Sequence, residues 1–560
     1  MSRSPLFSRL ARARRIAHFA DCLRISTPEA LERVAELEAA RAARRATRRE
    51  FLGNLARGAA AAGLASLAGP FAGTANAKPP GGGGGGNGPS IGIVGAGLAG
   101  MVCAKQLLAA GISATIYEAE ANRAGGRCWS FPNFVPGLAA ERGGEFIDNL
   151  HTTMLGFAKQ LNLARADFGK VPGETAYFLN GQHFHESEIV DRYRDFVASI
   201  RTDLHFISGD VTADNHTPDD VTIDSVSLEE CLDGHFGAHA PADPILKEAI
   251  RSAYEGEYGL EIFQQSCLNF ILFIHADKRS KMAWFGVYSD ERWYIVGGND
   301  QIPQGIAADL PGQFEFGRRL TAARKLADGR IELTFQRGVR VHDAVVFAIP
   351  FTVLRGVALH ESLGLSDDKK FAIDNLGYGN NAKLAIGFAG RPWATVQDSA
   401  PEGSNGTAYS NLPNVQVVFQ SSPNQATDSK AILVDYSSGA RGAGLNPNNA
   451  QNEAEQFLTD LDQVWPGAKA SAMRDNKGKL TKVHLEHWPS NPNSRGSYTC
   501  YTLGQFTSIA GNEGKPEGNV YFCGEHANSF YVWQGFMEGA CLSGIDAASQ
   551  ILADVKAGNL

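Results

Sequence analysis

The sequence predicts an α/β protein in which a Rossmann-like domain is interleaved with an α+β domain. Three observations predict this fold class. Residues 91–117 have the pattern of a strand, a glycine-rich turn, a helix and a second strand. Residues 314–346 alternate apolar and polar positions, as in a small β-meander, and a buried strand follows over 344–350. A last strand at 519–522 precedes a helix that runs to about residue 552. Because these segments are far apart, we expect a Rossmann-like domain built from three pieces of chain.

The composition supports two folded domains or one large interleaved one. The chain has 560 residues, of which 43% are hydrophobic and 20% charged, so a sizeable core can form and wholesale disorder is excluded. The net charge of −8 argues against a nucleic-acid partner. The charge is uneven, with +7 on residues 1–77 and −15 on the remainder. The eight cysteines form no CxxC pair, so we expect isolated buried thiols and no metal site.

Residues 1–77 show, in order, the parts of a twin-arginine export signal. Residues 47–52 (TRREFL) are followed by a weakly hydrophobic stretch at 58–75, and Ala75-Asn76-Ala77 supplies the small residues that a signal peptidase reads. The stretch is short and interrupted, so we expect no stable membrane insertion. We predict cleavage after Ala77, a periplasmic or secreted protein, and a flexible linker over residues 78–89.

The first strand–turn–helix unit carries a complete dinucleotide fingerprint. Strand 91–94 leads into residues 95–100 (GAGLAG) and a helix, and strand 114–117 then ends at Glu118. Gly95 permits the tight turn, Gly97 lets the backbone approach a pyrophosphate, and Gly100 lets helix and strand pack closely. The helix N-terminus attracts phosphates, and Glu118 can accept hydrogen bonds from ribose hydroxyls.

Two glycine-rich segments after the fingerprint favour a flavin over a nicotinamide dinucleotide. They are residues 123–127 (RAGGR) and 141–148 (ERGGEFID). With them, residues 90–555 resemble the flavin-containing amine oxidase family, which includes monoamine oxidases, polyamine oxidases and L-amino acid oxidases. The resemblance implies FAD, with Arg127 at its phosphates and Arg123 near the adenosine ribose. The spacing from Glu118 to Arg123 is one residue longer than in typical members of the family.

The resemblance also implies how the chain is divided. The FAD-binding domain would comprise residues 90–150, 291–351 and 511–560, and the substrate-binding domain residues 151–290 and 352–510. In the closing motif of the family, resembled here by residues 519–540, the start of the last helix meets the flavin. The FAD-binding residues that the resemblance implies are Gly95, Ala96, Gly97, Leu98, Ala99, Gly100, Glu118, Arg123, Gly126, Arg127, Gly144, Glu145, Leu320, Gly524, Glu525, Phe536 and Met537.

Three side chains would carry the implied chemistry. Lys383 resembles the family's active-site lysine, which reaches flavin N5 through a water. Tyr498 and Phe536 occupy the positions of two aromatic walls that clamp the substrate nitrogen and exclude water. Ser497 stands where some monoamine oxidases carry the cysteine that binds FAD covalently, so we expect non-covalent FAD. The implied reaction is hydride transfer from an amine to the flavin, hydrolysis of the imine to an aldehyde and ammonia or a shorter amine, and reoxidation by O₂ to H₂O₂.

The charged residues near the second glycine pair favour an amine substrate over an amino acid. L-amino acid oxidases have an arginine there for the substrate carboxylate, whereas this chain has Glu145 and Asp148, which suit a cation such as a polyamine or diamine. Arg495 could hold a carboxylate from the other side and keeps the amino-acid alternative open. A flavin desaturase or protoporphyrinogen-type oxidase and a non-enzymatic FAD protein are further alternatives. The sequence leaves the oligomeric state open, a homodimer included.

Overall fold

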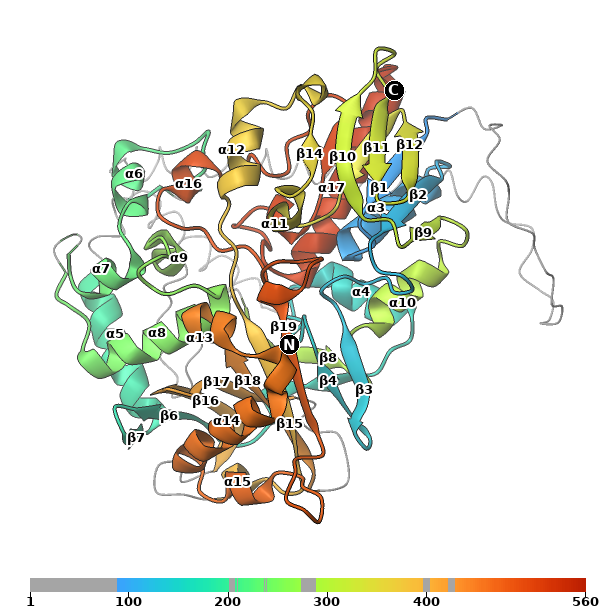
Figure 1. Ribbon diagram of the computed structural model, residues 1–560. Coiled ribbons are helices and arrows are strands. Elements are labelled where there is room, and N and C mark those ends of the chain that lie inside the picture. The colour runs from blue at the N-terminus through green and yellow to red at the C-terminus, as the bar shows by residue number, and fades with distance from the viewer. Residues whose placement is uncertain are drawn as a thin grey trace, which may run out of the picture. The chain divides into compact units, whose positions relative to one another are not determined.

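The computed structural model describes residues 88–200, 207–208, 210–235, 237, 239–272, 289–395, 403–421 and 429–560 (Figure 1). The predicted export signal and the linker as far as residue 87 lie outside these described residues. Within the described part of the chain, no helix is long and apolar enough to cross a membrane. The seven cysteines that are described, Cys103 to Cys541, are buried free thiols.

A five-stranded parallel sheet forms the predicted dinucleotide-binding part. Its central strand β1 (Ile91–Val94) lies between β13 (Ala344–Phe347) and β2 (Ala114–Glu118). Strands β20 (Val520–Phe522) and β9 (Phe314–Phe316) form the two edges. The four strands predicted for this sheet are confirmed, and their short apolar runs suit a sheet covered on both faces. The expectation for β9 was wrong, because it pairs with β2 and does not belong to the meander.

Two helices that are far apart in the sequence pack against each other beside this sheet (Figure 1). Helix α3 (Leu98–Ala109) follows β1, and α17 (Met537–Ala557) ends the chain. A Cβ atom added at Gly544 of α17 would lie 2.3 Å from the carbonyl oxygen of Ala99, so the two backbones nearly touch. A Cβ at Gly100 would lie 2.1 Å from the carbonyl oxygen of Gly95, which confirms the close helix–strand packing predicted for this glycine.

The predicted domain boundary at residue 150 needs correction. Helix α4 (Thr152–Gln160) follows that boundary but packs on α17, and its Met154 and Phe157 belong to the apolar cluster of the parallel sheet. The carboxylate of Glu538 accepts hydrogen bonds from the backbone N–H groups of Thr153 and Met154 and joins the two helices. Helix α10 (Gln301–Ala308) packs against α3 in the same cluster.

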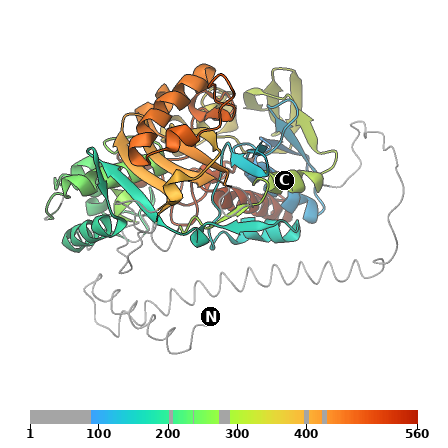
Figure 2. The ribbon, with the colours of Figure 1, turned by 90° about the horizontal axis from the view of Figure 1, so that it is seen from below.

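A seven-stranded mixed sheet dominates the second part. Its strands, in spatial order, are β19 (Val483–His487), β15 (Ala382–Phe388), β18 (Ala431–Ser437), β17 (Val415–Ser421), β16 (Ser404–Leu412), β6 (Glu174–Leu179) and β7 (Gln182–Phe184). Helices α14 (Ala450–Val464) and α15 (Ala468–Ser471) cover one face, as Figure 2 shows in orange. Helix α8 (Pro244–Tyr258) packs on the other face.

The remaining elements surround these two sheets. The small sheet next to the parallel one contains β12 (Gly338–His342), β11 (Ile331–Phe335), β10 (Leu320–Lys325) and β14 (Ala358–Leu359). Two-stranded ribbons are formed by β3 (Ser130–Val135) with β4 (Leu138–Glu141) and by β5 (Arg165–Asp167) with β8 (Trp293–Ile295). The other helices are α5 (Glu186–Ile200), α6 (Pro218–Asp224), α7 (Leu228–Leu232), α9 (Leu268–Ile271), α11 (Phe351–Leu354), α12 (Asp367–Asn375), α13 (Gly439–Gly444) and α16 (Gln505–Ser508).

The contact between α3 and α17 gives a test of the fold. We expect Gly544→Ala to lower the free energy of unfolding by about 1–3 kcal/mol, because its methyl group would meet the backbone of α3. The matched control is Gly156→Ala in α4, where an added Cβ meets nothing within 4 Å. This control should leave stability unchanged or raise it by up to about 1 kcal/mol. Thermal unfolding of the two purified variants measures both effects, and equal melting temperatures would contradict the prediction.

Candidate active site

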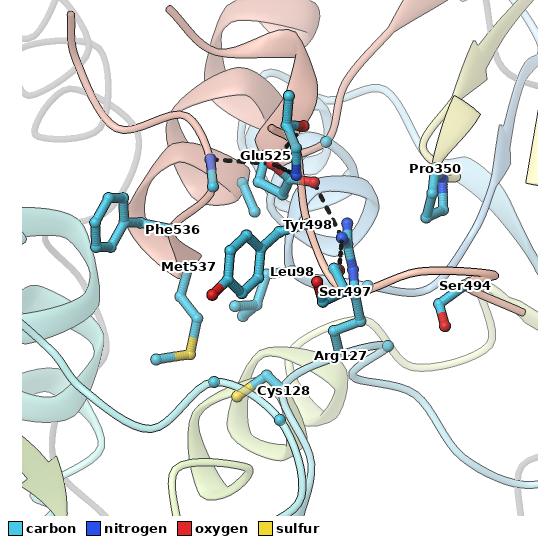
Figure 3. A pocket seen from close by; sticks show the side chains of 18 of the residues that line it. Leu98, Arg127, Cys128, Pro350, Ser494, Ser497, Tyr498, Glu525, Phe536 and Met537 are labelled. Carbon is cyan, nitrogen blue, oxygen red and sulfur yellow. Dashed lines mark hydrogen bonds and ion pairs between the residues drawn. The ribbon is translucent and has the colours of Figure 1, made fainter. Parts of the chain in front are cut away.

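A single cavity of about 820 Å³ runs from the first turn of the parallel sheet to one face of the seven-stranded sheet. The lining includes residues of strands β1, β2, β10, β15, β16, β17 and β18, of helices α3, α8 and α17, and of the loops between them. Figure 3 shows part of this lining, with Leu98, Arg127, Tyr498, Glu525 and Phe536 around the same space.

Backbone groups of a glycine-rich turn and of two helix starts form one part of the dinucleotide end of the cavity. Gly95 has a φ of 109°, which allows the sharp turn after β1. A Cβ at Gly97 would meet nothing within 4 Å, so a ligand can approach this backbone closely. Gly97 precedes α3 and Phe536 precedes α17, and neither side chain can cap its helix. Two helix N-termini therefore offer N–H groups and partial positive charge to the same cavity, which fits a phosphate group and an electron-rich ring edge.

Polar side chains at this end are held in place by hydrogen bonds. The carboxylate of Glu118 accepts hydrogen bonds of 2.8 Å from the backbone N–H groups of Ala96 and Glu120. The guanidinium of Arg123 lies 4.1 Å from the ring centroid of Trp129. Both residues line the cavity where an adenosine ribose is expected. The turn after β1 and the end of β2 set the positions of Glu118 and Arg123, and the local sequence predicts both of these elements.

Arg127 and Glu525 join the early and late parts of the chain. Arg127 donates to the carbonyl oxygen of Ser497 and, at 3.0 Å, to a carboxylate oxygen of Glu525 (Figure 3). Glu525 also accepts hydrogen bonds of 3.0 Å from the hydroxyl of Thr499 and from the backbone N–H of Gly535. Because Gly535 lies two residues before α17, Glu525 holds the segment that leads into the N-terminus of that helix.

Fifteen of the seventeen residues predicted to bind FAD line this cavity, Leu320 among them. Ala96 and Gly100 do not line it and are buried behind the turn, where Gly100 packs on β1. Gly144 faces α17, because a Cβ there would lie 2.7 Å from the sulfur of Met537. The segments quoted for the family resemblance therefore meet in one place, although hundreds of residues separate them.

Lys383 and Glu145 form a buried ion pair at the centre of the cavity wall. The ammonium of Lys383 lies 2.8 Å from Oε2 of Glu145 and donates a second hydrogen bond of 2.6 Å to the carbonyl oxygen of Gly143. The hydroxyl of Ser421 donates to the other oxygen of Glu145 at 2.6 Å. Lys383 and Glu145 are 5% and 6% exposed. The charge of Glu145 is therefore paired with Lys383, and each of its carboxylate oxygens already accepts a hydrogen bond, which favours a role in positioning Lys383 over its predicted role as a substrate ligand.

The two predicted aromatic walls, Tyr498 and Phe536, both line the cavity. The hydroxyl groups of Tyr498 and Tyr436 lie 2.8 Å apart. Phe536 packs edge to face against Trp533, with ring centroids 5.5 Å apart, and also contacts His151. Burial raises the pKa of Tyr498 and of Tyr436 well above 10, so both remain neutral. The site thus presents uncharged aromatic groups beside the Lys383–Glu145 pair.

The predictions for Asp148 and Arg495 as substrate ligands need correction. Asp148 is 1% exposed and is not among the residues that line the cavity, and its Oδ1 accepts a hydrogen bond of 2.7 Å from the backbone N–H of Glu291. Its Oδ2 lies 3.3 Å from Nε2 of His151, and burial raises the pKa of Asp148 to about 6. Arg495 is exposed and its guanidinium lies beside Gly356. Neither side chain is in a position to hold a molecule in the cavity.

The cavity-lining residues that were not found from the sequence include Tyr409, Tyr436, Trp533, Glu257 and Glu291. The register of the seven-stranded sheet places Tyr436 directly opposite Lys383, and only that pairing reveals its role. Trp533 belongs to the segment just before α17, whose sequence resembled the closing motif. Glu257 and Glu291 carried no local signal, because one lies in an amphipathic helix and the other in a loop.

The fold and the site together define a dinucleotide-dependent oxidoreductase, and comparisons with known proteins name its family. The family described as flavin-containing amine oxidoreductase matches residues 98–552, and the chain belongs to it. The L-amino-acid oxidase of Siganus canaliculatus is 24% identical over 478 residues, 82% of this chain and 84% of the relative. Polyamine oxidase 4 of Oryza sativa subsp. japonica is 22% identical over 497 residues, 82% of this chain and 88% of the relative.

Solved structures show the same fold. Cyclohexylamine oxidase from Brevibacterium oxydans IH-35A matches with a TM-score of 0.69 at 18% identity, covering 84% of this chain and 99% of that chain. Putrescine oxidase with bound putrescine matches with a TM-score of 0.66 at 18% identity, covering 83% and 99%. The predicted fold class, a Rossmann-like domain joined to a mixed-sheet domain, is therefore confirmed.

The contacts of Glu525 give a test of the cofactor end. We expect Glu525→Gln to weaken FAD retention about tenfold, because an amide accepts the Arg127 and Gly535 hydrogen bonds less strongly than a carboxylate does. Fluorescence titration of the apoprotein with FAD measures the dissociation constant. The control is Glu517→Gln, whose carboxylate accepts from Ser366 outside the cavity. An FAD affinity equal to that of the control would contradict the assigned contact.

Proposed function

We propose that this protein oxidises a primary or secondary amine with non-covalent FAD, using O₂ as the acceptor. The observation that carries the proposal is the continuity of the cavity, whose lining includes the dinucleotide turn together with Lys383, Tyr498 and Phe536. Membership of the flavin-containing amine oxidoreductase family supports the reaction class. FAD would supply the redox chemistry when bound, by taking a hydride from the carbon beside the amine nitrogen and passing two electrons to O₂, which leaves as H₂O₂.

The cavity residues fit FAD in three ways. The turn at Gly95 and Gly97 and the start of α3 would hold the pyrophosphate, and Arg127 would stand near it. The start of α17 would meet the electron-rich edge of the ring system. Ser497, where a covalent link would need a thiol, donates its hydroxyl proton to Oδ1 of Asn381 and is 4% exposed, which supports non-covalent binding.

Lys383 would orient a water molecule and stabilise negative charge beside the flavin. Its two short hydrogen bonds go to Gly143 O and Glu145 Oε2, and a third contact, to the carbonyl oxygen of Glu141, is long at 3.5 Å. A water in the cavity would compete with that long contact for the third ammonium proton, and that water would hydrolyse the imine product to an aldehyde and ammonia or a shorter amine. The Glu145 carboxylate keeps the Lys383 ammonium in a site that would otherwise disfavour its charge.

The aromatic side chains would hold the substrate nitrogen and keep water away. The ring faces of Tyr498 and Phe536 attract an ammonium group during entry. Exclusion of water then favours the neutral amine, whose lone pair assists hydride loss. An amine fits better than an amino acid here, because the arginines among the described lining residues, Arg123, Arg127, Arg318 and Arg319, all lie with the dinucleotide-end residues.

An L-amino acid oxidase is the second candidate, supported by the similarity to such an enzyme over most of both chains. A peroxide-coupled assay of the purified holoenzyme separates the two. We expect peroxide with putrescine, spermidine or butylamine and little with leucine or phenylalanine. Anaerobic bleaching of the flavin by the same compounds confirms that the first half-reaction is measured. Faster oxidation of leucine than of every amine would establish the amino-acid alternative. Purified protein without the yellow colour of bound flavin would contradict both candidate functions.

The variant Lys383→Met tests whether the lysine takes part in the reaction. We expect peroxide production to fall by about tenfold or more, equivalent to about 1.4 kcal/mol or more of barrier. The substitution leaves the buried charge of Glu145 without its ion-pair partner, which can destabilise the fold. The double variant Lys383→Met/Glu145→Gln removes that charge as well, so a loss of activity that persists in it reflects the missing lysine and not unfolding. Amine oxidation at the wild-type rate in both variants would favour the alternative of a flavin desaturase or protoporphyrinogen-type oxidase.

Non-covalent binding predicts how the flavin behaves on denaturation. Acid precipitation of the yellow holoenzyme should leave essentially all flavin absorbance in the supernatant, because Ser497 cannot form a thioether. Flavin that stays with the precipitated chain would contradict this prediction and would call for mapping of the attachment site among the buried cysteines.

The cellular location and assembly remain predictions from the sequence. We propose export by the twin-arginine pathway with cleavage after Ala77, a route that carries proteins already folded around a cofactor. We propose a homodimer as the assembly.

A further inference from the structure

The charges on the cavity wall carry an inference about how strongly the bound cofactor accepts electrons. We propose that Glu145 cancels the charge of Lys383 beside the flavin and thereby keeps the reduction potential of the bound FAD lower than Lys383 alone would set it. Glu145 then acts on the cofactor through its charge, in addition to holding Lys383 in position. The inference rests on the proposed function, because it takes the α17 end of the cavity as the place of the flavin ring.

The hydrogen bonds around the pair show that both groups are charged. Oε2 of Glu145 accepts from Lys383 at 2.8 Å, and Oε1 accepts from the hydroxyl of Ser421 at 2.6 Å. Two oxygens that both accept match an ionised carboxylate, because a protonated one carries a hydrogen on one of them. The nitrogen of Lys383 also has the carbonyl oxygens of Gly143 and Glu141 at 2.6 Å and 3.5 Å. Three acceptors around one nitrogen match the three protons of an ammonium group.

The pair lies where the glycines of the second glycine-rich segment meet the start of α17. Lys383 donates to the carbonyl oxygen of Gly143, and a Cβ at Gly144 would lie 2.7 Å from the sulfur of Met537, the first residue of α17. Glu145 follows directly in the sequence and lines the cavity together with Lys383 and Met537. The two charges therefore lie in the part of the cavity where the N-terminus of α17 would meet the flavin ring.

Lys383 is the cation that the seven-stranded sheet contributes to the described lining. The arginines of the described lining lie with the dinucleotide-end residues, and one of them, Arg127, is itself paired with Glu525 at 3.0 Å. Without Glu145, the sheet side of the flavin would carry one full positive charge. With Glu145 in place, the pair is neutral as a unit, and its field falls off faster with distance than that of a single charge.

The other carboxyl groups in this region add little charge at slightly acid pH. Burial, and then the charge of Glu145, raises the pKa of Glu141 to about 8. Burial raises the pKa of Glu257 to about 7 and that of Glu291 well above its ordinary value. All three carboxyl groups are therefore mostly protonated at pH 6. At that pH, Lys383 and Glu145 dominate the charge of this wall, so pH 6 is the condition for comparing potentials.

Transfer of a hydride places negative charge on the flavin. The amine loses the hydride from the carbon beside its nitrogen and becomes a cationic imine, while the neutral ring system gains the hydride and one negative charge. A single ammonium group nearby would stabilise that charge and raise the reduction potential. The neutral pair of Lys383 and Glu145 stabilises it much less, so Glu145 holds the potential down.

The consequence is a balance between the two halves of the reaction. A lower potential makes reduction of the flavin by the amine less favourable. It makes the transfer of two electrons from the reduced flavin to the acceptor more favourable by the same amount. Glu145 therefore shifts driving force from the oxidation of the amine to the reoxidation of the flavin.

The midpoint potential of the flavin in charge variants tests the inference. It is measured at pH 6 by anaerobic reduction of the holoenzyme with dithionite in the presence of a reference dye, so no amine is needed. We expect Glu145→Gln to shift the equilibrium by about tenfold or more toward reduced flavin, a rise of about 30 mV or more for a two-electron couple. Lys383→Met, which leaves the carboxylate without its cation, should shift the equilibrium in the opposite direction. The double variant Lys383→Met/Glu145→Gln has neither charge and should lie within about threefold of the wild type.

Two further variants separate charge from position. Glu145→Asp keeps the negative charge, so its potential should stay close to the wild-type value even if the shorter side chain displaces Lys383. The matched control is Glu455→Gln on α14, which removes the same kind of charge from the Arg474–Glu455 ion pair outside the cavity. This control should leave the potential unchanged. The absorbance of bound FAD reports whether each variant is folded.

The outcomes distinguish the inference from the proposed function. A potential that falls or stays the same in Glu145→Gln, or single variants that shift it in the same direction, overturns charge compensation by Glu145. If Lys383→Met does not retain FAD, the sign of the shift in Glu145→Gln and the return in the double variant still decide the question. Absence of peroxide from every amine and amino acid overturns the proposed function, whereas the dye titration still measures the effect of Glu145. Opposite shifts in the single variants, with the double variant near the wild type, support the inference.

Discussion

The close approach of α17 to α3 is the constraint on which the site depends. Gly544 allows the last helix to contact the carbonyl oxygen of Ala99 at the start of the first helix. This contact brings the N-terminus of α17 beside the turn after β1, so two helix ends open into one cavity. The Arg127–Glu525 pair fixes the same arrangement on the other side of the turn. A larger residue at position 544 would separate the helix ends and, with them, the two ends of the cofactor site.

A second constraint connects the two sheets. Lys383 belongs to the seven-stranded sheet, whereas Glu145 belongs to the segment that follows the dinucleotide turn. Taking both charges out of water is costly, and the pair is tolerated because Gly143 and Ser421 complete its hydrogen bonds. Such a pair adds little net stability, but it sets the lysine at a defined point of the wall. Glu145 therefore contributes the position of Lys383 more than net stability.

Asp148 shows how a correct motif can suggest the wrong role. Its place after the glycine pair predicted contact with a substrate cation, and the structure shows it buried behind the wall instead. From there it holds the backbone of Glu291 in a left-handed conformation and faces His151, whose ring contacts Trp533 and Phe536. Burial lowers the pKa of His151 to about 3, so its ring is neutral and serves packing. One buried carboxylate thus connects the acidic end of the cavity with its aromatic end.

The sequence by itself determined the parts of the protein whose physics is local. Short segments determine four features: the turn at Gly95, the close packing of Gly100 on β1, the acidic residue at the end of β2, and the start of α17. They follow from the backbone conformations open to glycine and from the partial charge at helix ends. Only the tertiary structure decided which side chains share the far end of the cavity. Tyr436 meets Lys383 through strand register, and Glu257 and Glu291 meet through a helix and a loop from separate parts of the chain. Contacts between segments far apart in the sequence depend on strand register and on how the sheets pack, and neither can be predicted from a short stretch of residues.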